Sequence, residues 1–368
     1  MKKRADRCEI EPRAEAGLLG SEPHGGLDVS ELRRLGIAPD QVVDFSVCLN
    51  PFGPAPGVAP AIARAAIDTY PDRDCRRLRA ALAEHLCVVP TQVLVGNGSS
   101  ELIALAALAY VRPGDRVLVL GPTYGEYARA ARLMGGKVIA CNASAGDDFK
   151  LGEGAVRQGL QETRPGLVFL CNPNNPTGTM LPVERIAGWA KQQPGCLFVV
   201  DEAYLSFAAD AASACFLGRD NILVLRSLTK DHALAGVRVG YAVGAEAVID
   251  VLARVRTPWS VSTAAEAAGL AAVRDRAHLE SCLRQLAQAK NELVDGLVKL
   301  GLAVLPSATH YFLVEVGNAT EFRARLLPHG MLVRDCTSFG LPGHVRISTR
   351  RPEENQRLLD VLAGSKAA

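Results

Sequence analysis

From about residue 90 to residue 245, short apolar runs typical of β-strands alternate with segments of helical pattern. The runs are VLV, RVLVL, KVIA, LVFLC, CLFVVD, ILVL and VRVGYAV, in chain order. Continuous apolar runs separated by helix-length segments are typical of a largely parallel sheet that is covered on both faces. The pattern therefore predicts a doubly wound α/β domain as the larger part of the chain.

A different pattern follows toward the C-terminus. Residues 263 to 300 form a long, mostly helical stretch, and the runs LAVLP, HYFLVEV, MLVRD and HVRIS come after it with one helical pattern between them. This order favours a smaller α+β domain. Residues 58 to 67 and 76 to 86 are also helical in pattern, and we expect the N-terminal arm to pack on both domains. The expected division is a flexible tail at 1–22, an N-terminal arm at 23–60, a large domain at 61–260 and a small domain at 261–368.

Length and composition are those of a globular protein with two structural units. The chain has 368 residues, of which 48% are hydrophobic and 22% charged. Its 41 basic and 39 acidic residues give a net charge of +2, which argues against nucleic acid as a partner. The ten cysteines form no CxxC pair and have no nearby histidine pair. We therefore expect no metal site, and reduced thiols in a cytoplasmic protein.

No segment predicts an export signal or a membrane span. The N-terminal MKKRADRCEIEPR carries charges of both signs and leads into no apolar stretch, so a cleaved secretory signal is not expected. The longest apolar run, LIALAALAYV at 102 to 111, falls well short of the roughly 20 residues that cross a bilayer. We predict a buried helix there and no membrane partner.

Two segments rich in special residues follow predicted strands. In GNGSSELI, at 96 to 103, a Gly-rich turn opens a helix, where exposed amides and the helix dipole can hold a phosphate. Taken alone, a plain strand-to-helix turn with Ser99 or Ser100 as N-cap is the favoured explanation. In NPNNPTG, at 172 to 178, two prolines and a glycine fix a rigid polar loop, and Asn175 is available to donate to an anionic oxygen.

Two further segments add charged groups at strand ends. VVDEAY places Asp201 after a buried strand, where it is either a helix cap or a functional carboxylate. RSLTKDHALAGVRVGY places Lys230 near Ser227, Thr229 and Arg238, and hydroxyls with an arginine are the groups that bind a phosphate dianion. Ligands bind at the carboxyl ends of strands in open α/β sheets, so we expect the four segments to form one site.

The segments NPNNPTG, DEAY, SLTK and GVRVGY occur in the order and spacing of class I and II aminotransferases, and the chain resembles that family. The resemblance implies the aspartate aminotransferase fold, which is fold type I of the pyridoxal 5′-phosphate (PLP) enzymes. Lys230 would carry PLP as a Schiff base, and Asp201 would pair with its pyridine nitrogen. Tyr204 and Asn175 would bind the phenolic oxygen, and Tyr124, in GPTYGEY, would stack on the ring. The phosphate would be held by Gly98, Ser99, Ser100, Ser227, Thr229 and Arg238.

The chemistry of PLP explains why these residue types are needed. A carboxylate keeps the ring nitrogen protonated, so that the ring can accept electrons from the substrate's α-carbon. A lysine serves first as the Schiff-base partner and afterwards as the general base or acid beside that carbon.

The resemblance extends to the substrate and to a partner subunit. Arg346, in HVRIS, matches the arginine that binds the substrate carboxylate in bidentate fashion. Arg334, in MLVRDC, resembles the arginine that histidinol-phosphate aminotransferases direct at their substrate. Tyr70, in TYPD, resembles the tyrosine that a partner subunit contributes to the cofactor phosphate. This implies a homodimer with shared active sites.

From about His24 to Leu362 the chain resembles the histidinol-phosphate aminotransferase branch. HGGLDVSELRRLGIAPDQVVDFSVCLNPFGP, TPWSVSTAAEAAG, LVRDC and RRPEEN resemble, more narrowly, threonine-phosphate decarboxylase of cobalamin synthesis. That likeness implies His24 at the substrate phosphate and Asn50 near the substrate carboxylate, although a lone histidine is equally an ordinary arm residue. The first expectation is decarboxylation of O-phospho-L-threonine to an aminopropanol phosphate. The alternative is transamination, as in histidinol-phosphate aminotransferase.

Two other classes of protein fit the sequence less well. A nicotinamide-dependent Rossmann enzyme needs GxGxxG after its first strand, and that motif is not found in this context. A transcription regulator built on a PLP fold would carry an added DNA-binding domain, for which the N-terminal tail is expected to be too short.

Overall fold

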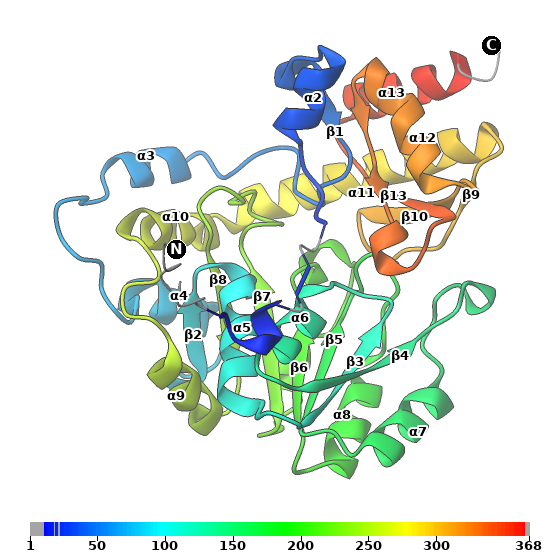
Figure 1. The fold of residues 1–368 in the computed structure, drawn as a ribbon. Helices are drawn as coiled ribbons and strands as arrows, with labels where there is room; N and C mark the ends of the chain where they lie inside the picture. The colour runs from blue at the N-terminus through cyan, green and yellow to red at the C-terminus, as the bar shows by residue number, and fades with distance from the viewer. Residues whose placement is uncertain (1–10, 18, 21–22, 365–368) are drawn as a thin grey trace, which may run out of the picture.

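The computed structural model describes residues 11–17, 19–20 and 23–364. Figure 1 shows a large layered α/β domain and a smaller domain beside it, with the long helix α11 (Arg276–Lys299) running between them. The flexible tail expected at residues 1–22 falls mostly on residues 1–10, 18 and 21–22, which lie outside the described residues.

A seven-stranded sheet forms the centre of the large domain. Its strand order is β2-β8-β7-β6-β5-β3-β4. Neighbouring strands are parallel, except that β8 runs antiparallel to both β7 and β2. The mostly parallel sheet that the apolar runs predict is thus confirmed. The strands are β2 (Val93–Gly96), β3 (Arg116–Gly121), β4 (Lys137–Asn142), β5 (Leu167–Cys171), β6 (Leu197–Asp201), β7 (Ile222–Ser227) and β8 (Gly240–Val243).

Helices cover both faces of this sheet, because successive residues of a strand point to opposite faces. In β3, Val117 and Val119 pack in one core with α5, α6 and α9, whereas Leu118 and Leu120 pack in another with α7 and α8. A third core joins α4 and α10 to β2 and β8. None of the described helices has both the length and the apolar character of a membrane span. The helices are α4 (Arg76–Leu86), α5 (Gly98–Tyr110), α6 (Glu126–Leu133), α7 (Glu153–Thr163), α8 (Val183–Gln192), α9 (Glu246–Val255) and α10 (Thr263–Arg274).

The small domain is built on a four-stranded antiparallel sheet of order β12-β13-β10-β9. One face of this sheet, with Phe312 of β10 and Ile347 of β13, packs on α11, α12 and α13. This matches the α+β pattern expected near the C-terminus. The remaining elements are β9 (Ala303–Val304), β10 (Tyr311–Glu315), β12 (Arg334–Asp335), β13 (His344–Ser348), α12 (Ala319–Leu326) and α13 (Pro352–Gly364).

The N-terminal arm contacts both domains. Strand β1 (Val43–Asp44) pairs in parallel with β11 (Met331–Leu332) of the small domain, and α3 (Val58–Ala63) packs on α10 of the large one. The arm also contains the short helices α1 (Ala14–Gly17) and α2 (Val29–Leu35). Because α10 packs with α3 and α4, its contacts favour a domain boundary after α10. The boundary expected at residue 260 stays a prediction.

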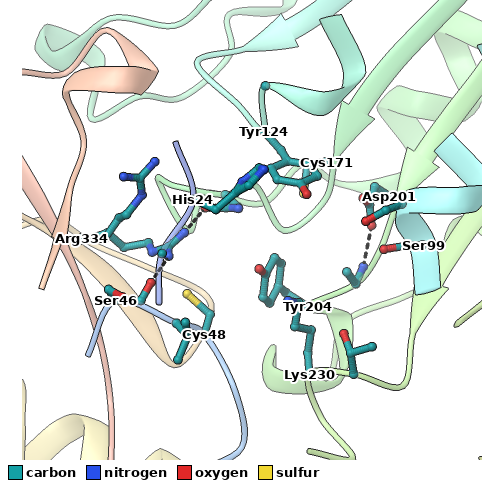
Figure 2. Close-up of a pocket in the computed structure, with 18 of the residues that line it drawn as sticks. His24, Ser46, Cys48, Ser99, Tyr124, Cys171, Asp201, Tyr204, Lys230 and Arg334 are labelled. Carbon is teal, nitrogen blue, oxygen red and sulfur yellow. Dashed lines mark hydrogen bonds between the residues drawn. The ribbon is translucent and has the colours of Figure 1, made fainter. Parts of the chain in front are cut away.

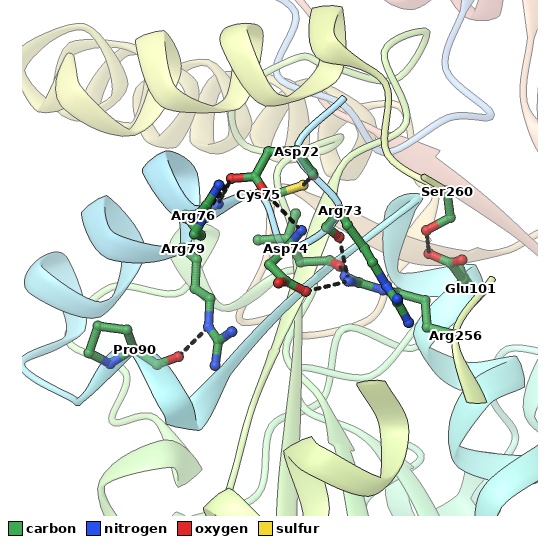
Figure 3. A network of polar contacts seen from close by, with 11 residues as sticks. Asp72, Arg73, Asp74, Cys75, Arg76, Arg79, Pro90, Glu101, Arg256 and Ser260 are labelled. Carbon is green, nitrogen blue, oxygen red and sulfur yellow. Dashed lines mark hydrogen bonds and ion pairs between the residues drawn. The ribbon is translucent and has the colours of Figure 1, made fainter. Parts of the chain in front are cut away.

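A polar network holds the turn before α4 against the end of β2 (Figure 3). The guanidinium of Arg256 is buried, and its two terminal nitrogens donate to the carbonyl oxygens of Val95 and Arg73, each at 2.6 Å. Asp74 forms an ion pair with the same guanidinium at 3.5 Å. The network fixes the strand end that leads into the Gly-rich turn.

Candidate active site

A cavity of about 250 Å³ lies between the two domains, and residues at the carboxyl ends of β5, β6 and β7 form part of its wall. Figure 2 shows Asp201 and Ser99 on its large-domain side and Arg334 and Ser46 on the opposite side. Most of the residues singled out from the sequence meet here, as expected for strand-end segments. Those that line the cavity are His24, Ser99, Ser100, Tyr124, Asn175, Asp201, Tyr204, Thr229, Lys230, Arg238, Arg334 and Arg346.

Asp201, the last residue of β6, is a buried carboxylate at the cavity wall rather than a helix cap. Its Oδ1 accepts a hydrogen bond from the backbone N–H of Ala203 at 3.0 Å, and its Oδ2 accepts one from the hydroxyl of Tyr127 at 2.7 Å. Burial raises the pKa of this carboxyl group, while the two donors oppose the rise. The functional alternative for VVDEAY is therefore the one that the geometry favours.

Lys230 follows β7 and lines the cavity with its side chain partly exposed. Burial lowers the pKa of its ammonium group, and the nearby charges of Arg346 and Arg238 lower it further. A lower pKa enlarges the fraction of neutral amine, which is the form that attacks a carbonyl carbon.

Asn50, expected beside the substrate carboxylate, is not among the residues that line the cavity. Its Nδ2 donates to the carbonyl oxygen of Asp231 at 2.9 Å, and its Oδ1 accepts from the N–H of Phe52 at 3.0 Å. Its own N–H donates to the carbonyl oxygen of Lys230 at 3.0 Å. These hydrogen bonds hold Asn50 against the loop that contains Lys230. Its expected place near the substrate carboxylate stays a prediction.

The Gly-rich turn forms an anion cradle with Arg238. Helix α5 begins at Gly98, whose φ is +72°, and a Cβ added there would lie 2.7 Å from Nη2 of Arg238. Neither Ser99 nor Ser100 caps the helix, because the N-cap position is Asn97 and no side-chain capping bond forms there. The hydroxyls of Ser227 and Thr229 lie 2.6 Å apart, and Thr229 lines the cavity whereas Ser227 does not. The arrangement suits a phosphate at a helix N-terminus.

The NPNNPTG loop is rigid because its own side chains tie it down. Asn172 exchanges two hydrogen bonds with the backbone of Leu181, at 2.7 and 3.0 Å, and Tyr311 donates to the carbonyl oxygen of Asn174 at 3.0 Å. Asn175 accepts a hydrogen bond at Oδ1 from Nη1 of Arg346, which leaves its amide nitrogen as a donor.

Two arginines of the small domain line the cavity. Arg346 is buried, and its Nη2 donates to the carbonyl oxygen of Ser46 at 2.5 Å. Arg334 donates from Nη2 to the carbonyl oxygen of Pro23 at 2.6 Å and to Oγ of Ser338 at 2.7 Å. Arg334 lies directly opposite Arg346 in the pairing of β12 with β13, and burial and the charge of Arg346 lower the pKa of Arg334. Such a pair is suited to an anionic group of a substrate.

His24 and Tyr70 differ in their relation to this cavity. His24 lines it from the N-terminal arm and lies 3.4 Å from a carboxylate oxygen of Glu126, with its ring 5.8 Å from that of Tyr124. Tyr70 is exposed and stacks on Trp259 at 4.6 Å, outside the cavity of its own chain. Its role in a partner's site stays a prediction.

Several lining residues were missed from the sequence. They include Ser46, Cys48, Tyr127, Cys171 and Ser338. Tyr127 could have been found, because it follows Tyr124 by three residues where a helix begins and so shares its face. Ser46 and Cys48 lie in the arm, whose contact with β11 is set by distant residues.

Comparison with known proteins agrees with this geometry. The family profile described as "Aminotransferase class I and II" matches residues 40–362. The chain belongs to this family. It is therefore a PLP-dependent enzyme with the aspartate aminotransferase-like fold.

Individual relatives cover nearly the whole chain. Histidinol-phosphate aminotransferase of Symbiobacterium thermophilum is 39% identical over 338 residues, 90% of this chain and 91% of the relative. That of Moorella thermoacetica is 34% identical over 367 residues, 96% of this chain and 94% of the relative. Among solved structures, histidinol-phosphate aminotransferase of Sinorhizobium meliloti in complex with PLP has a TM-score of 0.85 at 26% identity, covering 96% and 98% of the two chains. Aspartate aminotransferase of Thermus thermophilus with maleate has a TM-score of 0.80 at 27% identity, covering 91% and 94%.

Proposed function

We propose that the chain is an aminotransferase for a phosphorylated amino substrate, and that histidinol phosphate is the substrate it uses. The proposal depends on one observation: Arg346 and Arg334 line the small-domain side of a cavity that also contains Asp201 and Lys230. Two arginines supply the donors that a phosphate or carboxylate needs. The relatives named histidinol-phosphate aminotransferase support this choice of substrate over the decarboxylation expected first.

The residues present fit PLP. The absence of a Cβ at Gly98 lets the guanidinium of Arg238 lie against the start of α5, where a cation and a helix N-terminus suit a phosphate. A buried carboxylate and an amine line the same cavity as Arg238. Asp201 would bind the ring nitrogen, and Lys230 would hold the aldehyde carbon. When bound, PLP supplies a conjugated ring that draws electrons from the bonds of the substrate's α-carbon. We assign the phosphate to Gly98, Ser99, Ser100, Ser227, Thr229 and Arg238, the phenolic oxygen to Asn175 and Tyr204, and stacking to Tyr124.

Lys230 would transfer the proton of the substrate, and Arg346 would bind the substrate. The amine of Lys230 would take the proton from the α-carbon of the substrate and give it up again later in the reaction, and a lowered pKa enlarges the neutral fraction of the amine that can accept this proton. Arg346 would hold the anionic group of the substrate, so that the amino group faces Lys230. Asn175, fixed by Arg346, would link that binding to the phenolic oxygen of the cofactor.

The active unit that we propose is a cytoplasmic homodimer. Tyr70 is exposed and held in place by stacking on Trp259, outside its own cavity. A side chain presented in this way can reach the cofactor phosphate of a second copy.

The test is to incubate the purified protein with histidinol phosphate and 2-oxoglutarate and to measure glutamate. Glutamate formation that requires both substrates supports the proposal. In a parallel reaction with O-phospho-L-threonine, carbon dioxide is measured. Carbon dioxide without glutamate in either reaction would overturn the aminotransferase assignment.

Decarboxylation of O-phospho-L-threonine is the second candidate, and the position of His24 favours it. His24 lies at the cavity wall with Arg334 hydrogen-bonded to the adjacent Pro23, so both can reach a phosphate at that end. If this candidate is correct, His24→Ala should raise the KM for O-phospho-L-threonine about tenfold, because a contact to the substrate phosphate is lost. An unchanged KM, together with glutamate formation from histidinol phosphate, leaves the aminotransferase.

A further inference from the structure

The carboxylate of Asp201 has a second partner that the expected cofactor chemistry does not require. The hydroxyl of Tyr127, on α6, donates to Oδ2 at 2.7 Å, while the backbone of Ala203 serves Oδ1. Tyr127 is 1% exposed and Asp201 is 4% exposed, so water cannot readily replace this hydrogen bond.

The ring of Tyr127 is held firmly enough to fix its hydroxyl. It stacks on Phe169 at 5.3 Å with 9° between the planes, and it meets the edge of Tyr124 at 5.6 Å and 82°. Cys171, directly opposite Asp201 in the pairing of β5 with β6, lies beside the same hydroxyl. Aromatic packing on these neighbours leaves the hydroxyl little freedom to turn away from Asp201.

We propose that Tyr127 is a positioning residue for Asp201: its hydroxyl keeps the buried carboxylate ionised and aimed at the ring nitrogen of PLP. The proposal rests on the function proposed above for Asp201. Burial alone favours the protonated carboxyl, which cannot hold a proton on a ring nitrogen. A donor that stays in place favours the ionised form. Burial raises the pKa of Tyr127 well above its ordinary value, so the phenol remains protonated and can only donate at Oδ2.

Removing the hydroxyl of Tyr127 should therefore change the protonation of the cofactor's ring nitrogen and leave substrate binding unchanged. In Tyr127→Phe, the carboxylate loses a donor and its own affinity for protons rises. The proton shared with the ring nitrogen shifts toward Asp201, and the ring withdraws electrons less strongly. We expect kcat to fall about tenfold to hundredfold, with the KM for the amino substrate within about twofold of wild type.

The ring nitrogen itself provides the direct measurement. PLP labelled with ¹⁵N in the ring is bound to wild type, Tyr127→Phe and Asp201→Asn, and the ¹⁵N chemical shift is recorded by NMR. Wild type should give the shift of a protonated nitrogen, and Tyr127→Phe a shift displaced toward the unprotonated value. The pH at which the visible absorption of the bound cofactor changes should move upward in the same variant.

A matched control removes a different tyrosine hydroxyl. Tyr110 ends α5 and packs on the same core as Tyr127, but it does not line the cavity. Tyr110→Phe should keep the wild-type nitrogen shift, absorption and kcat. Should Tyr127→Phe fold poorly, a fluorotyrosine at position 127 keeps the shape of the ring and makes the phenol a stronger donor. The ¹⁵N shift and the visible absorption should then equal those of wild type, or change in the direction of a more fully protonated ring nitrogen.

The outcomes separate the two proposals. A protonated nitrogen in Asp201→Asn would show that Asp201 does not have its proposed role. A loss of the protonated shift in Asp201→Asn, with wild-type shift and kcat in Tyr127→Phe, would overturn the role of Tyr127 alone. A fluorotyrosine variant whose nitrogen shift moves toward the unprotonated value would also overturn it.

Discussion

Arg346 of strand β13 donates a hydrogen bond from Nη1 to Oδ1 of Asn175, which joins the small domain to the loop that follows β5 in the large domain. The same guanidinium donates from Nη2 to Ser46 of the N-terminal arm. One side chain therefore touches all three parts of the chain at the cavity. Each terminal nitrogen has a second proton, which stays available to an anionic substrate.

Substitution of Arg346 should affect binding of both substrates. In Arg346→Gln, we expect the KM for 2-oxoglutarate and for the amino substrate to rise about tenfold to hundredfold, because a charged donor pair is lost. Steady-state kinetics with each substrate varied in turn measures this. Arg351→Gln is the control, since Arg351 is exposed and its side chain donates to the carbonyl oxygen of Pro51, outside the residues that line the cavity. Wild-type KM values in Arg346→Gln would contradict the assignment.

Gly98 should be required for cofactor affinity because it lacks a side chain, and not merely because its φ is positive. In Gly98→Ala, the new Cβ would meet Nη2 of Arg238 at 2.7 Å, and we expect PLP to bind about tenfold more weakly. Gly36→Ala separates the two effects, because Gly36 also has a positive φ, of +68°, with open space around it. Both variants should lose about 1 kcal/mol of stability from strain. Titration of the apoproteins with PLP gives the affinities, and equal affinities would refute the cradle.

Mixing two inactive variants should restore activity if Tyr70 serves the partner's site. Tyr70→Ala and Lys230→Ala homodimers each lack a part of every site. Their heterodimer has one site with both residues intact, so random exchange of subunits should return about one quarter of wild-type activity. The measurement is turnover after the variants are dissociated and reassociated together. No gain over the separate variants would exclude a shared site formed by Tyr70.

The apoprotein should react with PLP at lower pH than an ordinary lysine does. Burial lowers the pKa of Lys230 below 10.5, so its neutral amine is present in larger amount at a given pH. The rate of PLP incorporation should therefore rise with pH and level off below pH 10.5. Rapid mixing with PLP at a series of pH values, followed by absorbance, gives this profile. Lys230→Arg supplies the background from other amines, and a midpoint at 10.5 would indicate an unperturbed lysine.

The sequence was most informative where chemistry and local structure coincide. Asp201 ends an apolar strand, and Asn175 and Lys230 follow apolar strands, each within a distinctive motif, so strand-end geometry brings the three together. The hydrogen bond of Asn50 could not be predicted, because its partner, the carbonyl oxygen of Asp231, is far away in the sequence. The spacing of Tyr127 from Tyr124 places both on one face, but the hydrogen bond from Tyr127 to Asp201 depends on how α6 packs over β5 and β6. No local pattern encodes such contacts.

The parallel pairing of β1 with β11 also bears on the order in which the chain folds. Val43 pairs with Met331, so two residues near opposite ends of the sequence must meet before this pair can form. Most neighbouring strands of the large sheet, in contrast, lie closer together in the sequence, although β2 pairs with the distant β8, and contacts of short separation form faster. During synthesis, the large domain can thus collapse on the ribosome while Phe45, which is part of the small-domain core in the folded protein, is still exposed to solvent. The arm is thus made long before its partner strand β11, and in that interval its apolar side chains add surface through which a newly made chain can aggregate.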